Sequence, residues 1–171
     1  MAKKDVKNDQ QIKKLVFYLC IVGVVLIGIS HIAAWKTADS WEMGVYTWGM
    51  TIDDEFGLFY EYITETDFSE ASTRDIVISI MGFLLFPISL ITLIQAGNTL
   101  QKSKKELKQM MLSARNTGAL GIFTIIWFYI FMTLNEILDY LDWGIGFILF
   151  LIGTIIFIVA AGFIHFTSID M

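Results

Sequence analysis

The side chains that could perform chemistry in this chain of 171 residues are few and widely spaced. His31 and His165 are the only histidines, and they fall near the ends of two different apolar segments. The only cysteine, Cys20, excludes a disulfide within the chain and a thiolate metal cluster. The sequence has no Gly-rich phosphate loop, no Gly-x-Ser-x-Gly and no His-Glu-x-x-His. We therefore expect no catalytic residue, no metal site and no cofactor, and we predict that the protein is not an enzyme.

Acidic side chains are the remaining group that could form a site. Residues 36–75 contain ten Asp or Glu and only two basic residues. Glu136 and Asp139 are three residues apart and would share a helix face. Together with Asp53, Asp54 and Glu55 they could supply oxygen ligands to a hard cation such as calcium. The sequence lacks the Asp and Gly spacing of a calcium loop, so a solvated acidic surface is the favoured interpretation.

Four apolar segments must position these side chains. The composition is 56% hydrophobic, and the mean hydropathy of +0.64 exceeds that of ordinary globular proteins. A helix needs about 20 apolar residues to cross the hydrocarbon core of a bilayer. The first run is longer than the apolar region of a signal peptide, which is the competing interpretation. The sequence thus predicts an all-α integral membrane protein, a four-helix transmembrane bundle with spans at 15–35, 76–97, 118–141 (including an outer extension) and 145–166.

The basic residues predict the orientation of these spans. The tail 1–14 and the loop 98–117 carry five Lys or Arg each, whereas the outer turn 142–144 carries none. Short basic loops stay in the cytoplasm. We therefore predict a multi-pass plasma-membrane protein with both termini cytoplasmic, including the last residues, 167–171. The lysines of the 98–117 loop either only set this topology or also bind anionic headgroups, and the net charge of −5 argues against nucleic acid.

Small and aromatic residues suggest how the helices are placed. Gly146, Gly153 and Ala160 recur every seven residues in the fourth span, which favours close approach of another helix. Trp35 and Trp143 fall at the outer ends of their segments, where we expect their rings at the level of the lipid headgroups.

The extracellular segment 36–75 is predicted to form a small β-sheet subdomain between the first two spans. Residues 41–52 and 58–64 are rich in aromatic and β-branched types and are separated by a turn-like cluster at 53–57. Residues 66–75 are predicted to form a short helix that leads into the second span. A small sheet with an uncovered edge can pair with another chain.

This plan resembles the claudin and peripheral-myelin-protein superfamily, which has four spans, a large first outer loop, a basic cytoplasmic loop and a short second outer turn. Trp41 is followed by Gly44-Val45-Tyr46, which is similar to the Gly-Leu-Trp of the family. Arg74 stands where the family has an arginine before its second span. The two loop cysteines of the family are absent, so its loop disulfide cannot form.

The resemblance implies self-association or adhesion through the outer loop, with a barrier or a cation-favouring pore as the result. The implied interface residues are Trp41, Gly44, Val45, Tyr46, Trp48 and Arg74. The acids that would face a cation are Asp53, Asp54, Glu55, Glu61 and Glu65. The expected partners are the lipid bilayer and either further copies of the chain or another membrane protein. The alternative is a non-catalytic accessory subunit of a larger membrane enzyme or transporter, and the sequence leaves both hypotheses open.

Overall fold

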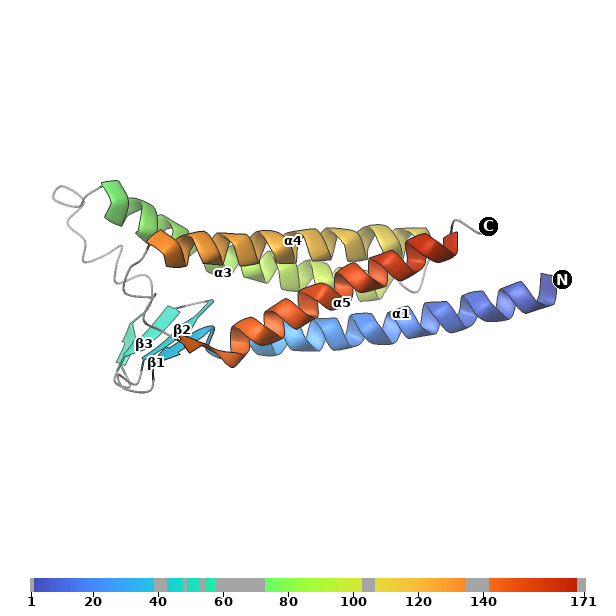
Figure 1. The fold of residues 1–171 in the computed structure, drawn as a ribbon, viewed down its shortest axis with the longest axis horizontal. Helices are drawn as coiled ribbons and strands as arrows, with labels where there is room; N and C mark the ends of the chain where they lie inside the picture. The colour runs from blue at the N-terminus through green and yellow to red at the C-terminus, as the bar shows by residue number, and fades with distance from the viewer. Residues whose placement is uncertain are drawn as a thin grey trace.

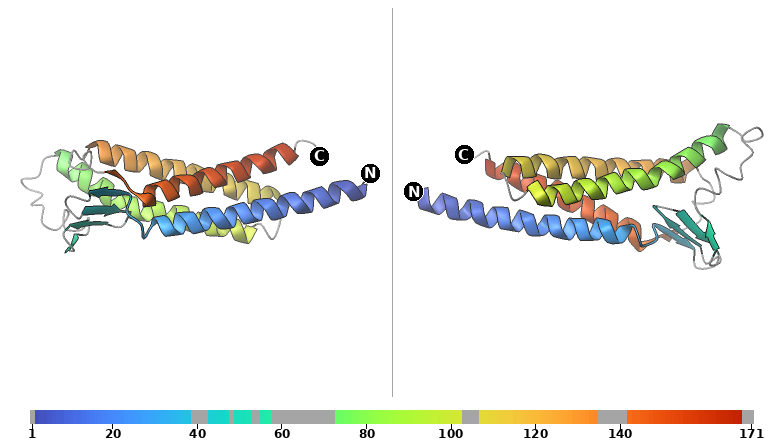
Figure 2. Two further views of the ribbon diagram at one scale, coloured as in Figure 1. Left: turned by 60° about the horizontal axis from the view of Figure 1, so that its bottom comes forward. Right: turned by 180° about the vertical axis from the view of Figure 1, so that it is seen from behind.

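A computed structural model describes residues 2–38, 43–47, 49–52, 55–57, 73–102, 107–134 and 142–168. Within these residues, four long helices carry a small sheet at one end (Figure 1). The start of α1 and the end of α5 lie together at the opposite end (Figures 1 and 2). Each helix is long and apolar enough to cross a membrane. The helices are α1 (Ala2–Ser30), α3 (Thr73–Lys102), α4 (Leu107–Leu134) and α5 (Ile145–Ser168).

The helices extend beyond the apolar runs into the polar segments. α1 begins at Ala2 and so includes the basic N-terminal tail. α3 continues to Lys102 and α4 begins at Leu107, so that most of the predicted 98–117 loop is helical. This segment contains no glycine or proline and is rich in Lys, Leu, Gln and Met, which are strong helix formers. The last residue of the predicted third span, Asn135, and its predicted outer extension, 136–141, lie outside the described residues.

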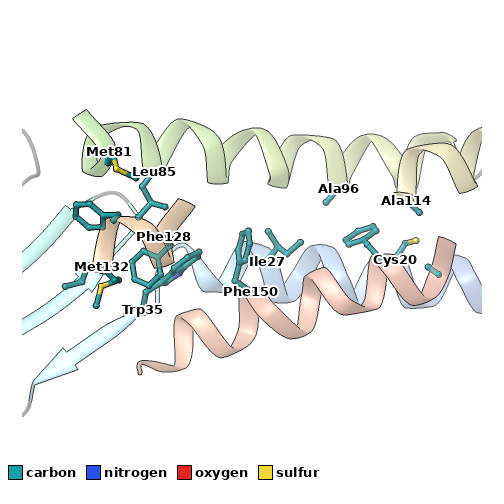
Figure 3. Packing of buried hydrophobic residues seen from close by; sticks show 14 of the residues in the cluster. Cys20, Ile27, Trp35, Met81, Leu85, Ala96, Ala114, Phe128, Met132 and Phe150 are labelled. Atoms are coloured by element: carbon teal, nitrogen blue, oxygen red, sulfur yellow. The ribbon is translucent and has the colours of Figure 1, made fainter. Parts of the chain in front are cut away.

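The bundle is built around α5, which packs against both α1 and α4, while α4 packs in turn against α3. A buried apolar cluster follows the length of the bundle (Figure 3). Trp35 and Phe128 lie at the sheet end of this cluster, Phe150 lies near its middle, and Cys20 and Ala114 lie toward the other end (Figure 3). Large apolar side chains also cover the outside of all four helices, as lipid contact requires. Examples are Val22, Ile94, Ile126 and Ile155.

Five short antiparallel strands form the sheet, in the order β4-β3-β2-β1-β5. Four of them come from the segment between α1 and α3, and β5 comes from the segment between α4 and α5. The sheet therefore joins these two segments of the chain. The strands are β1 (Lys36–Ala38), β2 (Met43–Tyr46), β3 (Gly49–Ile52), β4 (Glu55–Gly57) and β5 (Asp142–Trp143).

The strand boundaries differ from those expected. The single strand predicted over 41–52 is divided into β2 and β3, with Thr47 in the turn between them. The predicted turn at 53–57 was wrong in part, because Glu55–Gly57 forms β4. Strand preference depends strongly on the neighbouring strand, and here Phe56 pairs with Thr51 of β3. The strand predicted at 58–64 and residues 66–72 of the helix predicted at 66–75 lie outside the described residues. Residues 73–75 of that helix are the first residues of α3.

Candidate functional site: the sheet and its anchor

Trp35 connects the sheet to the helices. Its side chain is fully buried, and its ring packs at centroid distances of 4.9 Å from both Phe128 of α4 and Phe150 of α5. Its indole N–H donates to the carbonyl of Ser30 at 2.9 Å, which satisfies the one polar atom of the buried ring. The backbone N–H of Trp35 donates to the Val45 carbonyl of β2 at 2.6 Å.

The ring of Trp35 makes no contact with lipid headgroups because it is buried inside the bundle, whereas its depth in a bilayer stays a prediction. The position of Trp35 at the end of an apolar run is compatible with a ring in the membrane–water interface. However, phenylalanines of α4 and α5 line a site for the indole inside the bundle (Figure 3). Trp35 therefore acts as the anchor of the sheet.

The link from α1 to β1 crosses the link from β5 to α5 in direct backbone contact. Gly144 donates to the carbonyl of Trp35 at 2.9 Å, and Gly146 donates to the carbonyl of Ala34 at 2.8 Å. A Cβ atom on Gly146 would overlap the backbone carbonyl of Ala33, and one on Gly144 would overlap that of Ala34. Backbone atoms cannot move aside as a flexible side chain can, so both positions require glycine.

Lys36 lies inside this junction. Its side chain is only 5% exposed, and its ammonium lies 4.1 Å from the centroid of the Trp143 ring, a cation–π contact. The two residues face each other across β1 and β5. Trp143 is 46% exposed and stacks on Phe147 with ring centroids 4.4 Å apart. The lysine and the tryptophan together connect the segment between α4 and α5 to the sheet.

The predicted interface residues of β2 are inside the sheet. Gly44 and Val45 are buried, and Tyr46 is partly buried. β2 is paired with β1 on one side and with β3 on the other. These residues therefore support the sheet from within. Trp41 and Trp48, which were expected in the same interface, lie outside the described residues.

Arg74 lies at the start of α3, and its guanidinium donates to the carbonyl of Leu134 at 2.8 Å. This bond joins the start of α3 to the end of α4. Among the acids expected to face a cation, Glu55 is the first residue of β4, opposite Ile52. The other four, Asp53, Asp54, Glu61 and Glu65, lie outside the described residues. In the part of the chain that the structure describes, no three His, Cys, Asp or Glu residues are grouped to hold a metal ion.

The small residues expected to face another helix lie on the buried side of α5. Besides Gly146, a Cβ atom on Gly153 would lie 2.8 Å from Cγ1 of Ile27 and 3.1 Å from the carbonyl oxygen of Gly23, both on α1. Ala160 is fully buried one further heptad along. We define the glycine contact by three residues: Gly146 and Gly153 of α5, and Gly23 of α1. It joins α5 to α1 and to the link that follows α1.

A second helix contact was not anticipated. Hydroxyl groups join α3 to α4: Thr92 bonds Thr124 at 3.0 Å, and Thr99 bonds both Ser113, at 2.9 Å, and Thr117, at 3.0 Å. Thr92 and Thr99 are seven residues apart, as are Thr117 and Thr124. This repeat is the signal by which the sequence could have revealed them. We call these five residues the hydroxyl contact.

Comparisons of the chain with protein-family models, with curated proteins and with solved structures give no match. The four apolar helices identify a multi-pass membrane protein.

Proposed function

We propose that the protein is a claudin-like plasma-membrane protein that acts without catalysis, by self-association through its outer sheet. The observation that carries the proposal is the combination of a sheet fixed to the bundle at Trp35 with a strand, β4, that is the edge of the sheet among the described residues, at the far side from β5. The edge of a sheet presents backbone N–H and C=O groups that can pair with a strand of a second chain.

The anchoring supports this proposal because it orients the edge. The α1–β1 link and the β5–α5 link are hydrogen-bonded to each other through Gly144 and Gly146. A sheet held at two points loses little further freedom on association, which lowers the cost of binding. Among the described strands, β3 is the only neighbour of β4.

The distribution of charge supports an outward-facing sheet with both termini in the cytoplasm. Lys3, Lys4 and Lys7 lie in the first turns of α1, and Lys102 and Lys108 flank the α3–α4 junction. These residues lie at the end of the bundle that is opposite the sheet (Figure 2). Basic residues concentrate on the cytoplasmic side. A cation-favouring pore lined by the acids of the first outer segment is the finer form of the proposal and depends on sequence alone.

The proposal is tested with the full chain, extracted in mild detergent and weighed by native mass spectrometry. Successive N–H groups of an antiparallel strand point to opposite sides, so proline at Phe56 and proline at Gly57 remove donors on opposite edges of β4. We expect the wild type to give a ladder of multiples of its own mass. One of the two variants loses the N–H that points away from β3. We expect that variant to give only monomer, with the thermal unfolding temperature of the wild type.

Two outcomes would contradict the proposal. A ladder that survives both proline substitutions would show that β4 is not the contact. A single complex of fixed mass with foreign subunits would instead support the accessory-subunit hypothesis, because the chain would then depend on a partner of another kind.

A further inference from the structure

Exposed apolar side chains form a belt of nearly constant height around the four helices. Among the described side chains, the large apolar residues that the helices expose fall within 15–32 in and directly after α1, 77–94 in α3, 112–130 in α4 and 145–163 in α5. The first and last of them are seventeen positions apart at α1 and α3, and eighteen positions apart in α4 and α5. At a rise of about 1.5 Å per residue, each helix thus carries about 26–27 Å of exposed apolar surface. We call this belt the apolar girdle.

Polar side chains limit the girdle at both ends of the bundle. At the sheet end, the exposed residues Arg74, Thr133 and Asp142 each lie three positions beyond it. At the opposite end, exposed Lys14 directly precedes its first residue on α1. Arg115 of α4 is exposed one turn inside the girdle, from where its long side chain can reach the lipid headgroups. A taller girdle would therefore place polar groups in hydrocarbon, where they are costly.

The height of the girdle determines which bilayer it fits. A hydrocarbon core of about 27 Å matches it, whereas the core of a sterol-rich plasma membrane is about 32–33 Å thick. A girdle taller than the core can tilt, but a girdle shorter than the core forces the bilayer to thin. We infer that the apolar girdle selects a thin, sterol-poor bilayer with a core of about 27 Å. Within a plasma membrane, the chain would then occupy regions poor in sterol. The inference does not depend on self-association of the sheet.

Competition between lipids for the surface of the full chain, reconstituted in vesicles, tests this preference. The probes are phosphatidylcholines with two monounsaturated chains, one chain length per sample, with cores on both sides of about 27 Å. Each is mixed with a brominated phosphatidylcholine, which quenches tryptophan fluorescence. Trp127 lies within the girdle and is partly exposed, so its emission reports lipid contact. We expect the strongest binding near 27 Å, and binding on the order of twofold weaker at about 32 Å.

A shortened girdle should move this optimum. Ile32, Val77 and Ile145 are the limits of the girdle at the sheet end, and they are 77%, 41% and 59% exposed. The next exposed large apolar residue on each of their helices lies three positions further into the girdle, or about 4.5 Å. The triple variant Ile32→Ser, Val77→Ser, Ile145→Ser should therefore prefer a core thinner by about 3 Å, since α4 keeps its limit.

Three exposed residues outside the girdle, Lys14, Gln101 and Asp142, supply the matched control. The triple variant Lys14→Ser, Gln101→Ser, Asp142→Ser should keep the optimum of the wild type. In detergent, both triple variants should unfold at the temperature of the wild type, because all six side chains are exposed. An equal shift in both variants, an optimum at about 32 Å or above, or binding that does not depend on chain length would overturn the inference. The proposed self-association would stand in each case, because the mass of the detergent complex tests it separately.

Discussion

The two sides of the bundle are held together by different chemistry. On the side of α5 and α1, the glycine contact brings backbones together, with Gly153 beside Gly23 and Gly146 beside the Ala33–Ala34 backbone. On the side of α3 and α4, threonine and serine hydroxyls bond across the helices at 2.9–3.0 Å. The first contact depends on the absence of side-chain atoms, and the second depends on their polar ends.

This difference indicates how each side responds to change. Where backbones touch, one added carbon has no space, and the cost is steric. Where hydroxyls pair, a lost bond leaves groups that can still bond to their own helix: Thr117 also donates to the carbonyl of Ser113 at 3.0 Å. The α5 side also carries the anchor of the sheet. We therefore expect it to be the less tolerant of the two sides.

The largest effect is expected at Trp35. Trp35→Ala would leave a cavity among Phe128, Phe147 and Phe150 and should lower the free energy of unfolding by about 3–5 kcal/mol. Trp35→Phe keeps an aromatic ring but loses the hydrogen bond to Ser30, and should cost much less than the alanine variant. Reversible unfolding in mixed micelles, followed by circular dichroism, measures both. Equal losses in the two variants would mean that the buried ring volume is not what holds the sheet.

The next effect compares two glycines of the same helix. Gly146→Ala places a methyl group against the Ala33 carbonyl and should destabilise by about 1–3 kcal/mol, the usual range for overpacking. A Cβ atom on Gly162 would meet nothing within 4 Å. Gly162→Ala should therefore stabilise α5 by up to about 1 kcal/mol through helix preference. In the same unfolding assay, the two variants should change the free energy of unfolding in opposite directions if the glycine contact is steric. A change in the same direction for both would contradict a steric contact.

These two positions also show what the sequence could reveal. The four spans were predictable because uncharged runs of this length have few other structures. The spacing of Gly146, Gly153 and Ala160 marked one face of α5 because a helix repeats nearly every seven residues. Burial of Trp35 could not be predicted, since its site is built by phenylalanines that lie far away in the sequence. The same holds for β4 and β5, because residues with weak strand preference become strands only through the strand beside them.

The smallest effect is expected at the hydroxyl contact. Thr99→Val keeps the shape of the side chain but removes its bonds to Ser113 and Thr117. Hydrogen bonds between transmembrane helices average about 0.6 kcal/mol, so the loss should be about 1 kcal/mol. A double-mutant cycle with Thr117→Val isolates the pair, and its coupling should be below about 1 kcal/mol because Thr117 keeps its bond to the carbonyl of Ser113. A loss at Thr99 as large as that of Gly146→Ala would reverse the comparison, because the polar contact would then hold the bundle as strongly as the close backbones do.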